Sequence, residues 1–89
     1  MFYAYVLRSL KNNKRYVGST SIDPSERLKQ HNYGSNTWTR QNKPFVLLHF
    51  ESFNSKYEAR KRELFLKSGV GRKSLDSLEQ THNSSSTRG

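Results

Sequence analysis

The sequence predicts an α+β fold with a small three-stranded, mainly antiparallel sheet flanked by helices, in the order β-β-α-β-α-α. Two short, nearly continuous apolar runs at 2–8 and 45–50, and a shorter segment at 15–19 that contains Tyr16, Val17 and Gly18, have the length and composition of strands. Two helix starts carry capping signals. A chain of 89 residues supports one domain, which we expect to span 1–78, followed by a disordered polar tail at 79–89.

The segments at 2–8 and 15–19 predict a β-hairpin. The polar segment between them contains Asn12 and Asn13, and asparagine tolerates turn conformations. The strand period of two places Tyr5 on one face and Ala4 on the other. We expect Tyr5 and Tyr16 to be cross-strand partners on one face. Taken alone, such a pair indicates packing more often than catalysis, because aromatic residues are common in strands.

The first helix is expected to follow Asp23. Asp23 suits the N-cap and Pro24 the first helical position. Arg27 and His31 are four residues apart, so they share a face of this helix. Charged residues on a helix face usually meet only water. Here the helix begins shortly after Gly18, which permits close backbone approach, so this face should lie near the end of the second strand.

The second half of the chain predicts a loop, a strand and further helices. Residues 34–44 are rich in turn-forming residues, and we expect Trp38 to pack that loop. After the third strand, Ser55 caps the second helix and Gly69 ends it. A turn over 69–73 and then one or two helical turns complete the domain.

Composition limits the class of protein. Sixteen Lys and Arg against seven Asp and Glu give a net charge of +9, which indicates a polyanionic partner, with nucleic acid favoured. The absence of cysteine excludes disulfides and thiolate metal sites. No apolar run approaches the roughly 20 residues of a membrane span, and the N-terminus lacks a signal-peptide pattern. We therefore expect a soluble cytoplasmic protein without membrane association.

Glu63 has two open interpretations. It lies among basic residues of the second predicted helix, with Arg60 and Lys67 nearby. It can form an i,i+4 ion pair with Lys67, which stabilises a helix by only about 0.2–0.5 kcal/mol. It can also bind Mg²⁺, which suits one or two carboxylates together with phosphate oxygens and water. The sequence offers no His/Cys zinc cluster and no paired carboxylates for a two-metal site.

Together, these motifs resemble the GIY-YIG nuclease superfamily, and specifically its small stand-alone single-domain members, over about residues 2–75. The first motif is Tyr3-Ala4-Tyr5 and the second is Tyr16-Val17-Gly18. Each motif is weak alone, but their order and spacing are specific. The remaining matches are the family's helical Arg and His, its metal-binding Glu and two shorter segments, which here are Arg27, His31, Glu63, 39–44 and 71–73.

The chain departs from the family pattern at several positions. Tyr3 and Ala4 stand where the first motif has glycine and isoleucine, so only Tyr5 remains of it. Ser19 stands where some relatives carry a Lys near the scissile phosphate. No Asn matches the one that some relatives have beyond the Glu-bearing helix. These departures favour a second hypothesis, a nucleic-acid-binding module of the same fold with weak activity. A third hypothesis is a partner-dependent nuclease subunit.

The resemblance implies a divalent-metal-dependent endonuclease that hydrolyses DNA phosphodiester bonds with little sequence specificity, in DNA repair or recombination. Glu63 would hold Mg²⁺ or Mn²⁺. Arg27 would pair with the phosphate in the transition state through its planar guanidinium. Tyr16 would activate the attacking water, and Tyr5 would position it. His31 is the rival base or a phosphate contact, and the sequence does not choose between them.

Further residues would bind the nucleic-acid backbone without reading its sequence. We expect the protein to act as a monomer, and a protein partner is compatible with the sequence. The expected substrate-binding residues are Lys14, Gly18, Ser19, Thr20, Arg40, Lys67, Arg72 and Lys73.

Overall fold

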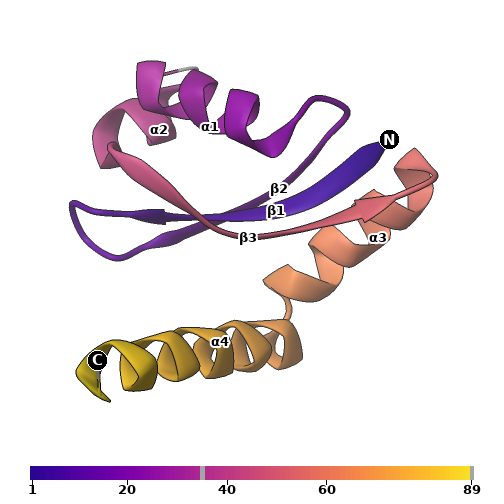
Figure 1. The fold of residues 1–89 in the computed structure, drawn as a ribbon. Helices are drawn as coiled ribbons and strands as arrows, with labels where there is room; N and C mark the ends of the chain where they lie inside the picture. The colour runs from indigo at the N-terminus through magenta and orange to yellow at the C-terminus, as the bar shows by residue number, and fades with distance from the viewer. Residues whose placement is uncertain (35, 89) are drawn as a thin grey trace.

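The computed structural model describes residues 1–34 and 36–88, with side chains for 1–34 and 36–79. The strands form one antiparallel sheet in the spatial order β2-β1-β3. Helices α1 and α2 cover one face of this sheet, and α3 and α4 lie on the other (Figure 1). The predicted α+β fold with a three-stranded antiparallel sheet is confirmed. The elements are β1 (Phe2–Ser9), β2 (Arg15–Thr20), α1 (Pro24–Tyr33), α2 (Thr37–Asn42), β3 (Phe45–Phe53), α3 (Lys56–Lys67) and α4 (Gly69–Arg88).

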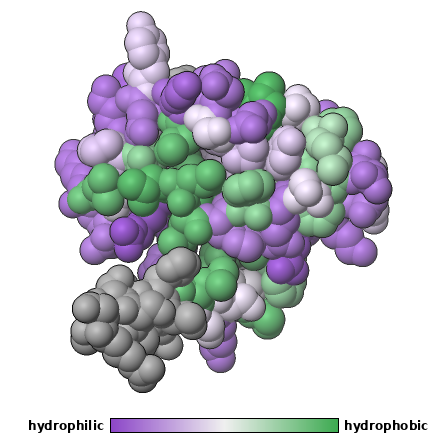
Figure 2. All heavy atoms as spheres, viewed as in Figure 1, coloured by the Kyte–Doolittle hydropathy of each residue, from purple (hydrophilic) through white to green (hydrophobic). Residues whose placement is uncertain are grey.

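The central strand β1 is buried on both faces, which explains its unbroken apolar sequence. On one face, Ala4 packs with Leu66 of α3 and Leu75 of α4. On the opposite face, Tyr5 packs with Phe45 of β3 and with side chains of α1 and α2. Hydrophilic atoms cover much of the helices, and apolar atoms gather at the level of the sheet (Figure 2). The sheet therefore separates two small cores.

The hairpin pairs β1 with β2 in a defined register. Its turn contains Asn13 with φ of 63°, a left-handed conformation that asparagine tolerates. The resulting pairing sets Tyr5 opposite Gly18 and Tyr16 opposite Leu7. Tyr5 and Tyr16 are therefore diagonal neighbours across the hairpin and are not directly opposite each other. The two tyrosines still share a face, and their ring centroids are 6.2 Å apart.

The predicted caps of α1 and α3 are confirmed. The Asp23 carboxylate accepts a hydrogen bond from the backbone N–H of Ser25 at 2.8 Å. The Ser55 hydroxyl accepts one from the backbone N–H of Glu58 at 3.1 Å. These side chains satisfy N–H groups that have no partner inside the helix. They fix where each helix starts, and thereby where its candidate site residues lie.

The segment 34–44 is not entirely a loop, because α2 lies within it. Asn36 and Thr39 form a capping box that starts this short helix. Trp38 packs as expected, with its ring stacked on that of Phe45 at a centroid distance of 5.7 Å. Six residues are too few for a helical hydrophobic period to emerge. Local capping and one aromatic contact form this helix instead.

The junction between α3 and α4 also differs from the prediction. Ser68, not Gly69, is the C-cap of α3, and the turn expected over 69–73 is the first part of α4. A Cβ at Gly71 would lie 2.1 Å from the carbonyl oxygen of Phe65. Glycine therefore lets α4 approach the end of α3 closely enough to turn directly into a second helix.

The predicted disordered tail at 79–89 overlaps the backbone of α4, which extends to Arg88 and is longer than the one or two helical turns expected. The side chains of 80–89 lie outside the described part of the chain, and the disorder of this tail stays a prediction. Among the described residues, no helix has both the length and the apolar character needed to cross a membrane.

Candidate active site

Tyr5 forms the centre of a buried polar cluster on the α1 face of the sheet. Its hydroxyl lies 2.9 Å from Nε2 of His31 and accepts a hydrogen bond from Nε of Arg27 at 3.3 Å. A Cβ at Gly18 would lie 2.6 Å from the Tyr5 hydroxyl oxygen. Only glycine leaves room for this phenol on the neighbouring strand. The predicted close approach at Gly18 is thus explained by the ring of Tyr5.

Burial keeps both ionisable rings of this cluster neutral at neutral pH. Burial raises the pKa of Tyr5 to about 12, although the bond from Arg27 acts in the opposite direction. Burial, reinforced by the positive charge of Arg27, lowers the pKa of His31 to about 4. Because Arg27 donates to the phenol oxygen, the phenol proton can be donated to Nε2 of the neutral imidazole. His31 Nδ1 is buried without a hydrogen-bond partner.

Tyr16 connects this cluster to a cavity. Its ring lies 4.6 Å from that of His31 and 5.4 Å from that of Trp38. Unlike Tyr5 and His31, which are fully buried, Tyr16 is half-buried. It lines a cavity of about 700 Å³ together with Trp38 and basic side chains. The tyrosine that the second motif contributes therefore faces space that a substrate can enter.

Glu63 lies on the opposite face of the sheet, where α3 packs against β2. Its side chain is 5% exposed and accepts hydrogen bonds from Ser19 Oγ at 2.8 Å, Arg60 Nη1 at 2.9 Å and Lys67 Nζ at 2.7 Å. Burial acts to raise the pKa of this carboxyl, but the bonds from Lys67, Ser19 and Arg60 outweigh it and hold the pKa below its usual range. Glu63 is therefore a buried, ionised carboxylate.

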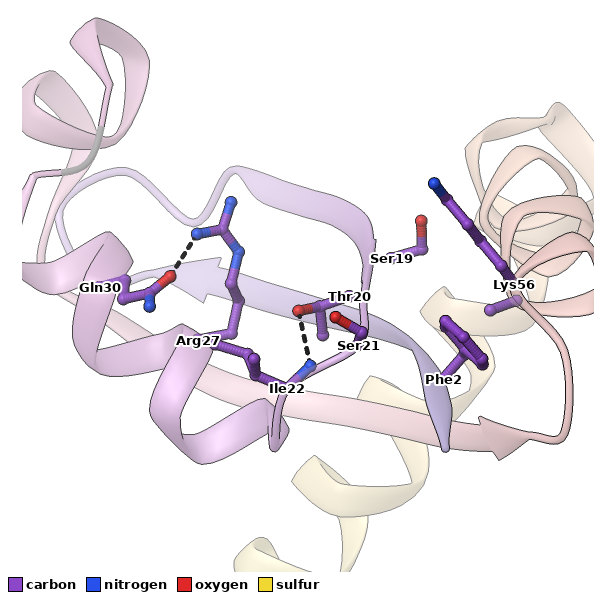
Figure 3. Close-up of a pocket in the computed structure, with 9 residues that line it drawn as sticks. Phe2, Ser19, Thr20, Ser21, Ile22, Arg27, Gln30 and Lys56 are labelled. Carbon is purple, nitrogen blue, oxygen red and sulfur yellow. Dashed lines mark hydrogen bonds between the residues drawn. The ribbon is translucent and has the colours of Figure 1, made fainter.

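The two halves of the site meet at the free edge of β2. Gly18 faces α1 and Ser19 faces α3, because successive strand residues point to opposite faces. Ser19 and Arg27 line one cavity of about 450 Å³, together with Lys56. The side chains of Ser19, Arg27 and Lys56 point to the same open side (Figure 3). The larger cavity likewise joins Tyr16 from one half with Lys67 from the other.

The two oxygens of the Glu63 carboxylate differ in how far they are occupied by hydrogen bonds. Oε1 accepts two hydrogen bonds, which fill its lone pairs, whereas Oε2 accepts only the bond from Lys67. An ionised carboxylate can hold Mg²⁺ or Mn²⁺ through one oxygen, here Oε2 once Lys67 moves away from it, with water and phosphate as the other ligands. No group of three or more His, Cys, Asp or Glu gathers within the described residues. The residues fit a one-carboxylate metal site.

The structure brings most of the predicted substrate-binding residues to the β2 edge. Ser19 and Thr20 line the smaller cavity, and Lys14, Lys67 and Arg72 line the larger one. Two predictions lie elsewhere. The Arg40 guanidinium donates to the Gly34 carbonyl and the Thr37 hydroxyl, away from both cavities, and Lys73 is exposed and lines neither.

Among the residues that the sequence did not single out are Gln30 and Lys56 of the smaller cavity and Arg60, a partner of Glu63. Gln30 and Lys56 line that cavity, and Gln30 accepts a hydrogen bond from Nη1 of Arg27 at 2.5 Å. Gln30 is three residues after Arg27, and Arg60 is three residues before Glu63. This i,i+3 spacing was the available signal. Nothing in the sequence distinguishes Lys56 from other exposed lysines.

Comparison with known proteins identifies the family of this domain. Residues 1–76 match the model of the GIY-YIG catalytic domain. The chain is 38% identical over 68 residues to the UPF0213 protein CPE1444 of Clostridium perfringens. The matched region covers 75% of this chain and 71% of that protein. It is 34% identical over 83 residues to the UPF0213 protein YazA of Bacillus subtilis, with 92% and 82% covered.

A solved structure is also similar. The solution NMR structure of the UPF0213 protein BH0048 from Bacillus halodurans superposes with a TM-score of 0.51 at 35% identity, covering 88% of this chain and 85% of the other. The similarity thus extends over most of both chains.

Proposed function

The chain belongs to the GIY-YIG family, and we propose that it is a divalent-metal-dependent endonuclease that hydrolyses DNA phosphodiester bonds with little sequence specificity. The observation that supports this proposal most directly is the position of Glu63, a buried ionised carboxylate at the free edge of β2. It is hydrogen-bonded to Ser19, which lines the cavity of Arg27, and to Lys67, which lines the cavity of Tyr16. In a chain with a net charge of +9, the charged residues that line the two cavities are mostly cationic, and Glu63 adds an ionised carboxylate beside them. That combination suits a metal and a phosphodiester.

Each side chain has a role that its position supports. Mg²⁺ or Mn²⁺ on Glu63, when bound, would stabilise negative charge on the phosphoryl and leaving oxygens. Arg27 pairs with the phosphate, because its guanidinium lies at the smaller cavity and is oriented by Tyr5 and Gln30. Tyr16 orients or deprotonates the attacking water from the larger cavity.

We assign the water-activating role to Tyr16 rather than His31. His31 is fully buried, and its Nε2 is engaged by the Tyr5 hydroxyl. It therefore positions Tyr5 and, through ring contact, Tyr16. A phenol needs positive charge nearby to act as a base. Lys14 and Lys67 line the same cavity as Tyr16 and supply such charge.

Binding without sequence readout follows from the chemistry of the cavity walls. Lys14, Lys56, Lys67 and Arg72 are suited to phosphate contacts. The edge of a three-stranded sheet inserts neither a helix nor a ribbon into a major groove, where bases are distinguished. We propose action as a cytoplasmic monomer in DNA repair or recombination.

The test compares the purified protein with Glu63→Gln in metal-dependent cleavage. The substrates are plasmid DNA, branched DNA, single-stranded DNA and RNA. We expect cleavage in Mg²⁺ or Mn²⁺ that falls about 100-fold or more in Glu63→Gln. Glu26→Gln, which neutralises an exposed carboxylate on α1, is the matched control and should cleave normally. Equal cleavage by Glu63→Gln would reject the proposal.

A second outcome would support a different function. Salt-sensitive binding without cleavage, unaffected by metal or by Glu63→Gln, indicates a binding module of the same fold. The alterations at Tyr3, Ala4 and Ser19 favour this alternative. Activity that appears only with a co-purified protein indicates a partner-dependent subunit.

A further inference from the structure

Lys67 occupies the part of Glu63 that a metal would need. Glu63 Oε1 is filled by donors from Ser19 and Arg60, at 2.8 and 2.9 Å. Oε2 has a single donor, Nζ of Lys67 at 2.7 Å. A metal that approaches the carboxylate through its less occupied oxygen therefore meets the ammonium group of Lys67.

Lys67 also faces the place where substrate would lie. Its side chain is 49% exposed, and it lines the cavity of about 700 Å³ that contains Tyr16. Arg60, the other cation on Glu63, lines neither that cavity nor the smaller one. Lys67 is thus the cation that contacts both the carboxylate and the cavity in front of Tyr16.

An ammonium group and a divalent ion cannot share one carboxylate oxygen without strong repulsion, because like charges only a few ångströms apart interact unfavourably even in water. Lysine carries its charge at the end of a flexible four-carbon stem. A change of side-chain rotamer can therefore move the ammonium from Oε2 into the cavity, while the backbone of α3 stays in place. A phosphodiester in that cavity would receive the displaced charge.

We infer that Lys67 is a positioning residue. In the free protein its ammonium group occupies the oxygen of Glu63 that a metal would bind, and this group moves to the substrate phosphodiester when the metal binds. The inference rests on the proposed function, since it needs Glu63 to be the metal ligand. It explains how a buried carboxylate stays ionised and paired before either ligand arrives. It also couples metal binding to substrate binding through one side chain.

The first experiment measures Mn²⁺ binding to the full-length protein by electron paramagnetic resonance, without DNA. Lys67→Met removes the charge and keeps most of the stem. We expect it to bind Mn²⁺ about tenfold or more tightly than wild type, because the competing ammonium is gone. Lys61→Met is the matched control, since Lys61 is exposed on the same helix with no contact to Glu63, and it should bind like wild type.

Glu63→Gln separates failure of this inference from failure of the proposed function. Loss of Mn²⁺ binding in Glu63→Gln, with no gain in Lys67→Met, overturns the proposed competition between Lys67 and the metal, but it supports Glu63 as the metal ligand. Mn²⁺ binding that is the same in wild type, Lys67→Met and Glu63→Gln overturns both. Thermal unfolding followed by circular dichroism confirms that each variant is folded.

The second experiment measures DNA affinity with and without metal, using a phosphorothioate substrate that resists cleavage. Without metal, Lys67→Met should bind DNA like wild type, because Lys67 is engaged with Glu63. With Mn²⁺, its affinity should fall relative to wild type, and the salt slope should decrease by about one, as expected for one lost phosphate contact. A purely structural role predicts the same change in both conditions, and that result would refute the transfer.

Discussion

His31 is a neutral histidine whose burial makes the stability of the protein depend on pH. Its pKa is about 4 in the folded protein, compared with an ordinary value of 6.5. Between these values the unfolded chain binds more protons than the folded one, so the free energy of unfolding rises with pH. The contribution is fully present above about pH 6.5 and is lost as the pH falls through about 4.

We expect the titration of His31 to contribute about 3 kcal/mol to the change in unfolding free energy between pH 4 and pH 7. The pKa of His31 falls from 6.5 to about 4 on folding, and each pH unit corresponds to about 1.36 kcal/mol. Urea unfolding of wild type and His31→Phe across this range measures it. The variant should lose the pH slope in that window, whatever its absolute stability. An unchanged slope would show that His31 does not titrate as described.

Gly18 tests whether packing around Tyr5 sets the site geometry. A Cβ at Gly18 would meet the Tyr5 hydroxyl oxygen at 2.6 Å and the ring at 2.8 Å. We expect Gly18→Ala to cost about 1–3 kcal/mol in urea unfolding, because the buried phenol must move away from His31. Gly69→Ala is the control, since a Cβ there meets nothing within 4 Å. Equal midpoints for the two variants would contradict this packing.

At the scale of elements, capping signals were predictable and packing-dependent features were not. Asp23 and Ser55 fixed the starts of α1 and α3 from local chemistry alone. The short helix α2 was missed, because its capping box at Asn36 lies in a segment rich in turn residues. The register of Tyr5 depended on the left-handed residue in the hairpin turn, which composition does not determine.

The same division applies to the candidate site. The pairing of Glu63 with Lys67 follows from helix periodicity and was one of the two predicted interpretations. The bond from Ser19 to Glu63 joins residues 44 positions apart and depends on how α3 docks against β2. Sequence spacing therefore predicted which groups can pair within one helix, and tertiary packing determined which groups touch across elements.

Helix α4 is tied to the start of β2 by Arg15. The guanidinium contacts Asp76, donates to Glu79 at 3.2 Å and reaches the carbonyl of Arg72 at 3.4 Å. The family match ends at residue 76, so Glu79 lies beyond it. Two of the seven acidic residues of the chain are thus used to fasten one helix beside the cavity that contains Tyr16.

We expect the double variant Asp76→Asn/Glu79→Gln to loosen α4 locally with little effect on global stability, because partly exposed ion pairs contribute on the order of 1 kcal/mol or less. Hydrogen exchange of the α4 amides over 69–79 should accelerate about fivefold. Glu26→Gln breaks an exposed pair with Lys29 on α1 and should leave α4 unchanged. Unaltered exchange in the double variant would show that other contacts hold this helix.

At the scale of the whole molecule, the free edge of β2 organises the surface. One cavity lies at its C-terminal end beside Ser19 and Thr20, the other lies beside its N-terminal residues, and Glu63 packs between them. Arg15, the first residue of β2, is already paired with Asp76 and Glu79. A polyanionic chain that follows this edge would pass both cavities and the carboxylate, which makes its path testable by charge removal.

Binding to the phosphate backbone releases counterions, so the logarithm of affinity falls with the logarithm of salt concentration by about 0.9 per phosphate neutralised on duplex DNA. Lys14 and Arg72 line the larger cavity, and neither has a side-chain ion pair among the described residues. Lys14→Met/Arg72→Met should therefore reduce the salt slope by about two.

The double variant Lys11→Met/Lys61→Met is the control. It removes the same charge from outside both cavities, so it matches the net charge of the test variant. Its slope should stay near that of wild type, because the slope counts contacts and not total charge. Equal losses in the two double variants would mean that DNA is attracted by the overall charge of +9 and does not follow the β2 edge.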